Sequence, residues 1–249
     1  MWTRADLKQS AKDVLRKNYW MAFLVSLVYS ILAGGVSSGS SSANSSVSRQ
    51  ITSSSGGMDL NVTLAILGVM LTISAIAFIV GIAVSFFVTG PMNVGKNRYY
   101  MESRVKDSSF GQLFYGFKAN YMGNASSMFV TNLFIGLWSL LLVVPGIIKG
   151  LEWSQVAYLL AENPNLTGQR ARQISSAMTE GEKWDIFVLQ LSFIGWNLLG
   201  ALACGIGVFF VNPYVEATFA ELYARLRDKA LTNGFATIDE LPGIDPVIS

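Results

Sequence analysis

Leu60–Thr89 is a run of 30 residues without a single charged side chain. A helix needs about 20 mostly apolar residues to cross the hydrocarbon core of a bilayer, so this run exceeds the length of one crossing. Apolar runs of this length are typical of membrane helices rather than of helices in water-soluble cores. The run therefore predicts a transmembrane helix that tilts, bends near Gly81 or protrudes from the bilayer.

Five further segments share this apolar character. Only 14% of the residues are charged, against about 25% in soluble proteins, and the mean hydropathy is +0.42. Pro145-Gly146 and Gly205-Ile206-Gly207 separate two pairs of segments and indicate tight turns. The predicted spans are Tyr19–Gly35, Leu60–Thr89, Met128–Val144, Ile147–Ala161, Ile186–Gly205 and Val208–Tyr223. We expect an all-α fold, a polytopic membrane helix bundle whose six transmembrane helices form three hairpins. A cleaved signal peptide is the alternative for the first span, because that span ends in small residues.

The basic residues lie on one side of this topology. Loops rich in Lys and Arg stay in the cytoplasm, according to the positive-inside rule. With the N-terminus inside, sixteen of the eighteen Lys and Arg residues fall in cytoplasmic segments, and the exceptions are Arg49 and Lys149. The sequence therefore predicts a multi-pass protein of the cell membrane with both termini in the cytoplasm.

An amphipathic helix is predicted on the cytoplasmic side before each hairpin. Thr3-Arg4-Ala5-Asp6 fits the start signal of the first helix, which extends to about Asn18, and Thr167 is the predicted cap of the third. Such basic, amphipathic helices lie in the headgroup layer or pack against the end of the bundle, and both arrangements fit the pattern. The apolar positions at helical spacing are Leu7, Ala11, Val14 and Leu15; Phe110, Leu113, Phe114, Phe117 and Tyr121; and Ala171, Ile174, Ala177 and Met178.

The domain organisation follows from composition. Residues 1–228 are expected to form a single membrane domain. Residues 37–55 include eleven serines, a composition that cannot bury a core, so residues 36–59 are expected to be a mobile extracellular loop. Residues 229–249, which contain Pro242-Gly243 and Pro246, are expected to be a flexible cytoplasmic tail.

The sequence contains no recognisable catalytic or metal-binding set. Histidine is absent and Cys204 is the only cysteine, which excludes His-based triads, disulfides within the chain and the common zinc sites. No phosphate-binding loop or nucleophile elbow is present. The net charge of +2 is too small to indicate nucleic acid. We therefore expect no enzymatic activity, no cofactor and no bound metal.

Two carboxylates fall inside predicted spans. Charged groups in hydrocarbon are costly, so Glu152 and Glu216 are candidate functional residues. Together with Asn197 and Lys149 they predict a polar ligand-binding cavity about 10 Å below the outer surface. The alternative is structural, since Lys149 lies one turn from Glu152 and intramembrane amides join helices by hydrogen bonds.

Several sequence blocks resemble the domain-of-unknown-function 975 family of bacterial integral membrane proteins. The blocks are A-K-D-V-L-R-K-N-Y-W (11–20), V-P-G-I-I-K (144–149), L-A-E-N-P (160–164), G-E-K-W-D (181–185), S-F-I-G-W (192–196), P-Y (213–214) and E-L-Y-A-R-L (221–226). They occur in the expected order over nearly the whole chain. The resemblance implies a multi-pass protein of the bacterial plasma membrane, distantly similar to the membrane domain of some glycerophosphodiester phosphodiesterases. It implies no reaction and no catalytic residue.

The expected function is to organise lipid or a membrane partner without catalysis. The expected partners are membrane lipids, together with a partner membrane protein or further copies of the chain. The alternative is a small-molecule permease that uses a polar cavity around Glu152 and Glu216. A weak internal repeat, in which residues 81–88 are similar to 205–211, favours this alternative, although apolar residues also recur by chance.

Overall fold

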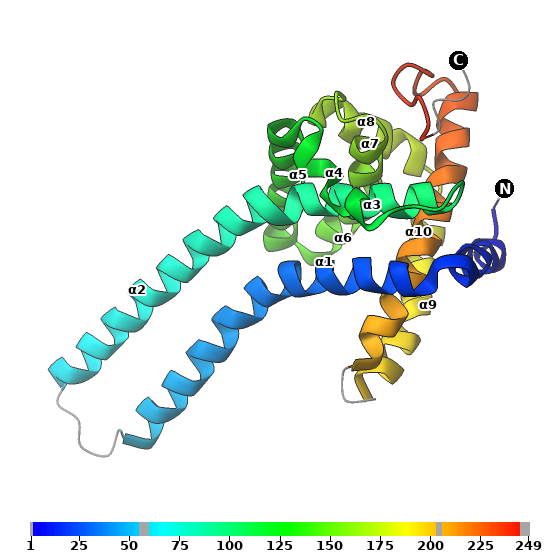
Figure 1. The fold of residues 1–249 in the computed structure, drawn as a ribbon. Helices are drawn as coiled ribbons and strands as arrows, with labels where there is room; N and C mark the ends of the chain where they lie inside the picture. The colour runs from blue at the N-terminus through cyan, green and yellow to red at the C-terminus, as the bar shows by residue number, and fades with distance from the viewer. Residues whose placement is uncertain (1, 55–59, 203–205, 245–249) are drawn as a thin grey trace.

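Helices α1 and α2 form a long arm that projects from the rest of the molecule (Figure 1). The computed structural model describes residues 2–54, 60–202 and 206–244, and these residues form helices, turns and no strands. The elements are α1 (Arg4–Ser54), α2 (Leu60–Val84), a π-helix (Ser85–Thr89), α3 (Gly90–Ser103), a 3₁₀-helix (Phe110–Phe114), α4 (Tyr115–Lys118), α5 (Tyr121–Leu141), α6 (Val143–Glu152), α7 (Val156–Glu162), α8 (Gly168–Thr179), α9 (Lys183–Leu202) and α10 (Ile206–Thr232). The prediction of an all-α fold is confirmed.

Three helical stretches in the described residues are long and apolar enough to cross a membrane: Thr63–Ser103, Tyr121–Leu141 and Lys183–Leu202. They contain most of the second, third and fifth predicted spans. The first of them is 41 residues long because α2, the π-helix and α3 follow one another without a break. Its most apolar window contains no buried residue. Such a surface is unfavourable in water, so these helices fit a membrane protein.

Asn18 divides α1 into two helices. Its backbone leaves the helical region, with φ −138° and ψ 41°, and its side-chain amide donates to the Asp107 carboxylate at 2.7 Å. The first part begins as predicted, because the Thr3 hydroxyl accepts a hydrogen bond from the Asp6 N–H at 3.1 Å. The sequence left open whether this amphipathic helix lies in the headgroup layer or packs against the other helices. In the structure it packs against them, because its apolar side chains, among them Leu7 and Ala11, are buried in the core.

The π-helix provides a local reason for the bend between the arm and the core. A π-turn leaves backbone carbonyls without their usual partners inside the helix. The Tyr121 hydroxyl, at the start of α5, donates to the Phe87 carbonyl at 2.9 Å. Phe86 packs edge-on against Phe129 of α5, with ring centres 5.3 Å apart. These contacts attach the base of the arm to α5.

The fourth predicted span is not one helix. The chain turns at Leu142, which is extended (φ −153°, ψ 132°), three residues before the predicted turn at Pro145-Gly146. Proline is well tolerated in the first turn of a helix, and here it lies near the start of α6 rather than in the turn. The helix breaks again after Glu152, so α6 is only 10 residues long and extends about 15 Å. Every residue of α7 is buried.

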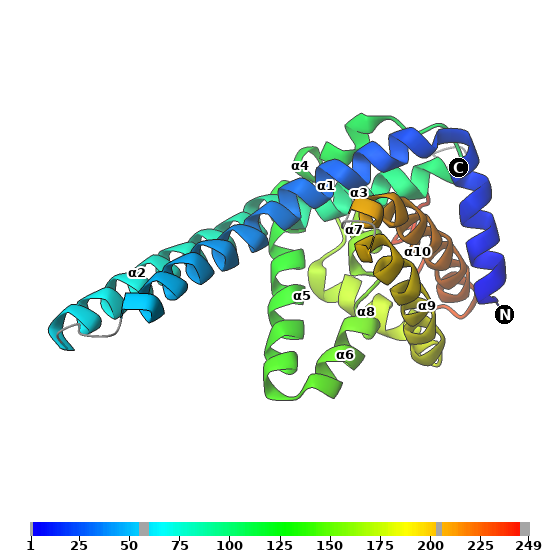
Figure 2. The ribbon, with the colours of Figure 1, turned by 90° about the horizontal axis from the view of Figure 1, so that it is seen from below.

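The predicted hairpins differ in direction. The arm formed by α1 and α2 projects to one side, and the joined ends of α9 and α10 project downward (Figure 1). The turn between α5 and α6 projects in a third direction, which is visible in the view from below (Figure 2). The expected bundle of six transmembrane helices in three hairpins is therefore not confirmed: three described stretches are apolar enough to cross a membrane, and the projecting helix pairs differ in direction.

Three further expectations need correction. Helix α1 continues through the Ser-rich stretch to Ser54 where a loop was predicted, while residues 55–59 lie outside the described residues. The absence of proline and the modest helix penalty of serine make this possible. The second predicted amphipathic helix is broken into a 3₁₀-helix, α4 and the start of α5. The predicted flexible tail instead continues α10 to Thr232, and Leu241 is fully buried in the core. Residues 245–249 of this tail lie outside the described residues.

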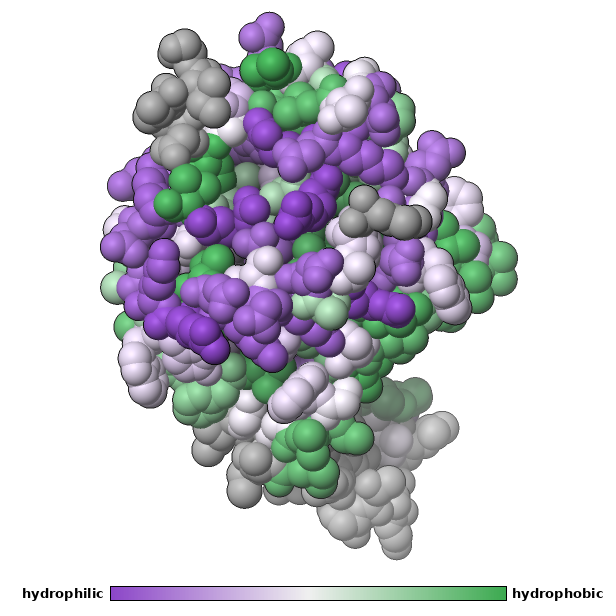
Figure 3. All heavy atoms as spheres, turned by 90° about the vertical axis from the view of Figure 1, so that its right-hand side faces the viewer, coloured by the Kyte–Doolittle hydropathy of each residue, from purple (hydrophilic) through white to green (hydrophobic). Residues whose placement is uncertain are grey.

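The surface divides into a polar and an apolar part. On the face shown in Figure 3, hydrophilic residues gather over the upper part and hydrophobic residues lie toward the lower edge. Large exposed apolar side chains occur on α2, around the turn between α5 and α6, and at the end of α9, for example Phe78, Leu140 and Leu202. The charged side chains of the interior, by contrast, belong to α3, α7 and α10. The interior is thus mostly apolar but contains several buried ion pairs, and this ion-paired part of the molecule is here named the polar core. The helix ends that project from it contain no charged residue except Arg49 of α1.

Candidate functional site

A pocket of about 570 Å³ opens between α6, α8 and the start of α9. Two basic and two acidic side chains line it, together with an indole ring, two glutamines and a serine hydroxyl. These include Arg172, Lys183, Glu152, Glu180, Trp153 and Ser176. The lining therefore offers both signs of charge and many hydrogen-bonding groups.

Glu152 organises one wall of the pocket. It is the last residue of α6, and its carboxylate accepts from Lys149 at 3.0 Å, from Lys183 at 3.1 Å and from the Ser176 hydroxyl at 2.7 Å. The Ser175 hydroxyl donates to the Glu152 backbone carbonyl at 2.6 Å, which satisfies an acceptor left free where α6 ends. One residue thus joins α6, α8 and α9.

Arg172 of α8 also lines the pocket. Its guanidinium donates to the Thr131 hydroxyl on α5 at 3.3 Å, and no carboxylate pairs with it among the described residues. Partial burial lowers the pKa of the guanidinium from its usual 12.5, but the group stays protonated at neutral pH. Arg172 is therefore a cation with unused donors at the edge of a pocket.

Trp153 connects the pocket to the apolar surface. Its indole N–H donates to the Ser176 hydroxyl at 3.2 Å, and Lys149 Nζ lies 5.2 Å from the centre of its ring. The other edge of the ring meets Phe134 of α5, with centres 6.3 Å apart. Phe134 is 45% exposed and belongs to the uncharged end of α5. The pocket therefore lies at the border between the polar core and the apolar helix ends.

Glu216 belongs to a separate ion pair. It accepts from Lys96 Nζ at 2.5 Å, and that ammonium lies 4.3 Å from the centre of the Tyr29 ring. Lys96 is only 6% exposed. Nearby, the Tyr100 hydroxyl donates to the Ala22 carbonyl at 3.0 Å. This polar cluster lies between α1, α3 and α10.

The predicted cavity is not assembled as one site. Glu152 and Lys149 share the α6–α9 pocket with Lys183, whereas Glu216 pairs with Lys96 on α3. Both of these new partners come from segments that the sequence predicts to be cytoplasmic. The early turn at Leu142 and the break after α6 return Glu152 to the polar core.

Asn197 lies on α9 apart from both clusters. Its side-chain oxygen is buried and has no hydrogen-bond partner among the described residues. No contact of the described residues connects it with Glu152 or Glu216. Its predicted role in a shared cavity therefore has no support from the geometry.

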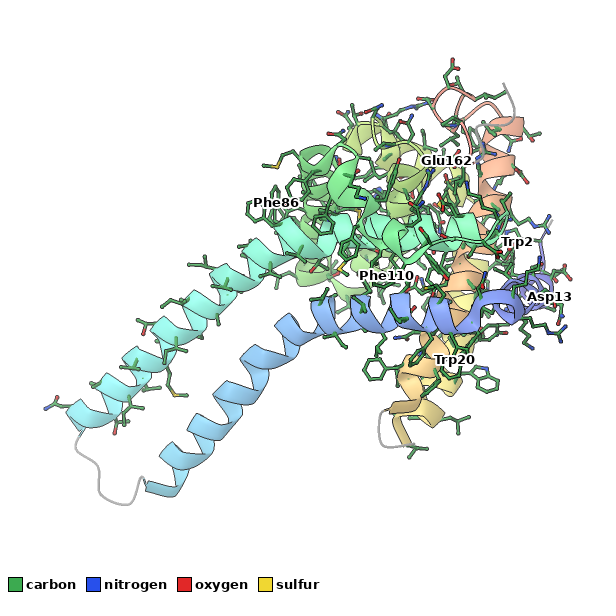
Figure 4. The ribbon with its side chains drawn as sticks, viewed as in Figure 1. Trp2, Asp13, Trp20, Phe86, Phe110 and Glu162 are labelled. Atoms are coloured by element: carbon green, nitrogen blue, oxygen red, sulfur yellow. The ribbon has the colours of Figure 1, made fainter. Side chains whose placement is uncertain are left out.

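Sequence reasoning missed the buried ion pairs that hold the core together. The Glu162 carboxylate lies in the interior beside α10 (Figure 4) and its side chain is fully enclosed. It accepts from the Tyr223 hydroxyl at 2.5 Å, from Arg227 at 2.8 Å and from the Gly243 N–H at 2.8 Å. Glu221 likewise pairs with Arg104 at 2.8 Å. The family resemblance offered a signal for these residues, since Glu162, Glu221 and Tyr223 all fall in the blocks L-A-E-N-P and E-L-Y-A-R-L.

The described residues contain no group of three or more His, Cys, Asp or Glu side chains that could hold a metal ion. Of the two carboxylates that line the pocket, Glu152 is engaged by two lysines and a serine hydroxyl, and Glu180 is exposed. What the arrangement can do is bind a polar group by charge and hydrogen bonds next to an apolar surface.

The fold and this site define an all-helical protein with three helical stretches apolar enough to cross a membrane, a polar core and a pocket at the apolar border of this core. The family model described as a protein of unknown function (DUF975) matches residues 98–230, just over half of the chain. The chain belongs to this family. The matched region covers α5 to α9, most of α10 and therefore the whole pocket. No curated protein and no solved structure matches the chain.

Proposed function

We propose that this protein organises lipid in the plasma membrane of a bacterium without catalysing a reaction. The observation that carries the proposal is the division of the molecule into an ion-paired polar core and uncharged helix ends. A protein of this shape inserts its helix ends among acyl chains while its core stays at the headgroup level. A partner membrane protein or a further copy of the chain on the same apolar helices is part of the proposal.

The proposed topology keeps both termini in the cytoplasm and retains six membrane-directed segments arranged as three pairs. Each pair of segments leaves the polar core and returns to it. Both termini therefore stay on the same side of the membrane, whether a pair crosses the bilayer completely or only enters it. Lys149 supports this orientation, because it shares Glu152 with Lys183 of a predicted cytoplasmic segment. Only Arg49 then lies outside the cytoplasmic set of basic residues.

The resemblance to the membrane domain of glycerophosphodiester phosphodiesterases is part of the same proposal. In such an arrangement a membrane domain would hold lipid while a separate domain carries out chemistry. In this proposal the present chain corresponds to the lipid-holding membrane domain.

Retention of lipid by the purified protein tests the proposal. The full chain is extracted from bacterial membranes in a mild detergent, washed extensively and analysed by native mass spectrometry. We expect several phospholipids to remain bound to each protein molecule. Retention no greater than that of an unrelated membrane protein with a similar number of helices would overturn the proposal.

A permease is the second candidate, and the buried Lys96–Glu216 pair favours it. A charged pair surrounded by Tyr29 and Tyr100 in an apolar setting resembles the ion-coupling groups of transporters. If this reading is correct, Glu216→Gln should abolish uptake of a substrate by vesicles that contain the protein, while lipid retention stays unchanged. A protein that transports none of a broad metabolite set would exclude the permease.

A further inference from the structure

The pocket between α6, α8 and α9 has the charge distribution of a receptor for a ligand that carries both signs. Arg172 and Lys183 are its basic lining residues and Glu152 and Glu180 its acidic ones. Glu152 is already neutralised by two lysines, whereas Glu180 is exposed. A dianionic ligand would meet Glu180 unfavourably, but a ligand with one negative and one positive group would find a partner for each.

The positive part of the pocket suits a phosphate group. Arginine binds phosphate through two parallel hydrogen bonds, and Arg172 has donors that no described carboxylate occupies. Lys183 lies at the start of α9, where the free N–H groups and the helix dipole also favour an anion. The helix dipole adds to the positive potential that the Arg172 and Lys183 side chains create in the pocket.

The surroundings of the pocket favour a lipid over a water-soluble ligand. Trp153 lines the pocket and packs against the exposed ring of Phe134. Ile147 and Ile148 of α6 are also exposed, one turn before the charged end of that helix. Trp184, 71% exposed, follows Lys183 and is typical of a residue at the headgroup level. A headgroup in the pocket would therefore place its acyl chains along α5 and α6.

We propose that this pocket binds the zwitterionic headgroup of a phospholipid, with the phosphodiester at Arg172 and Lys183 and the ammonium at Glu180. The inference rests on the proposed lipid-organising function and names the lipid class and the site. No covalent step is involved. The pocket selects one kind of lipid from the bilayer, and the remaining apolar surface contacts lipid without selection.

Direct binding of short-chain lipids tests the proposal. The probes are dihexanoyl phosphatidylethanolamine, dihexanoyl phosphatidylglycerol and glycerophosphoethanolamine, which has the same headgroup without acyl chains. Affinity is measured by microscale thermophoresis on the full chain in detergent. We expect the phosphatidylethanolamine probe to bind at least fivefold more tightly than the phosphatidylglycerol probe, and the chainless probe at least tenfold more weakly. Equal affinity for the two lipids would overturn the zwitterionic assignment, and equal affinity with and without acyl chains would overturn the lipid assignment.

Variants separate the pocket from the rest of the surface. Arg172→Gln should weaken binding of the phosphatidylethanolamine probe about tenfold, because it removes a charge-assisted hydrogen-bonding pair. Arg16→Gln is the matched control, because the Arg16 side chain is 78% exposed on another helix, and it should leave binding unchanged. Ala177→Trp keeps all charges and fills the pocket, so it should abolish binding even if Arg172→Gln folds poorly.

The two proposals fail in different ways. If both pocket variants remain folded by circular dichroism and bind the lipid like the wild type, the pocket assignment is wrong. If wild-type protein retains phospholipid in the wash experiment and the pocket variants retain as much, the lipid-organising function stands and the pocket proposal falls. If the wild type retains no phospholipid, the proposed lipid-organising function is wrong, and the pocket proposal that rests on it is wrong as well.

Discussion

Glu162 shows at the residue scale how the polar core is held. Burying a carboxylate is costly unless hydrogen bonds and an opposite charge compensate, and Glu162 has all three of its donors in place. The same carboxylate connects α7, α10 and the C-terminal segment, so its removal should destabilise the packing of all three.

Replacing Glu162 with Ala should lower the free energy of unfolding by about 3–5 kcal/mol, because the partly buried Arg227 would lose its counter-ion and the buried Tyr223 hydroxyl its acceptor. Chemical denaturation in detergent measures the change. Asp13→Ala is the control: it removes the exposed Asp13–Arg16 pair and should cost less than about 1 kcal/mol. Similar losses in both variants would contradict the assignment of a buried ion pair.

Glu240 gives the C-terminal segment a pH dependence. Hydrogen bonding to Arg170, together with the Thr237 N–H, lowers the pKa of Glu240 from 4.5 to about 2. A carboxyl group with a lowered folded-state pKa stabilises the fold fully above its unfolded pKa and loses that contribution as the pH falls toward the folded value. The stabilisation should therefore be present above about pH 4.5 and disappear between that pH and about 2.

A comparison of wild type with Glu240→Gln across pH checks this dependence. The two melting temperatures in detergent should differ by a constant amount above pH 5 and converge as the pH approaches 2. The group is mostly at the surface, so salt should reduce the difference. A difference that stays constant down to pH 2 would show that the carboxylate does not act through Arg170.

At the scale of elements, close backbone approach joins α9 and α10. A Cβ atom added at Gly200 would lie 2.7 Å from the Val208 backbone nitrogen and 2.8 Å from the Gly207 carbonyl carbon. Small residues allow such contact between membrane helices, where van der Waals packing replaces the hydrophobic effect as the source of association. The crossing therefore requires glycine at both positions.

Gly200→Ala should destabilise the α9–α10 pair by about 1–3 kcal/mol, because the methyl group meets backbone atoms that cannot move aside. Gly195→Ala on the same helix is the matched control, since nothing lies within 4 Å of its added Cβ atom. That change should be neutral or stabilise the helix by up to about 1 kcal/mol. Thermal unfolding in detergent distinguishes them, and equal behaviour would mean that the helices do not touch at Gly200.

At the scale of the whole molecule, the distribution of charge predicts which side of the membrane the polar core faces. The buried ion pairs gather in one part of the structure, and the helix ends that leave this part contain no charged residue except Arg49 of α1. Because a charged residue in the hydrocarbon core costs several kcal/mol, the polar core and not the helix ends should face the cytoplasm.

Accessible cysteines test this orientation in intact bacterial cells. In a Cys204→Ser background, Ser41→Cys should react with a membrane-impermeant thiol reagent from outside. Asp239→Cys, at an exposed position of the C-terminal segment, should react only after the cells are opened. Labelling of Asp239→Cys in intact cells would invert the topology.

The membrane-spanning character of Leu60–Thr89 could be predicted from sequence, because an uncharged apolar stretch of this length is unfavourable in water. The sequence also predicted the helix starts at Thr3 and Thr167, since capping depends on a side chain and the backbone three residues away. These properties are local, and local physics needs no knowledge of the fold.

The partners of the charged residues depend on the tertiary structure and could not be predicted from the sequence. Glu152 meets Lys183 and Glu216 meets Lys96 across 31 and 120 residues of sequence, and no local pattern specifies such a pairing. The early turn at Leu142 and the break after α6 place Glu152 beside α8 and α9, apart from Glu216. Ion pairs and pockets arise where helices cross, and the crossings depend on packing of the whole chain.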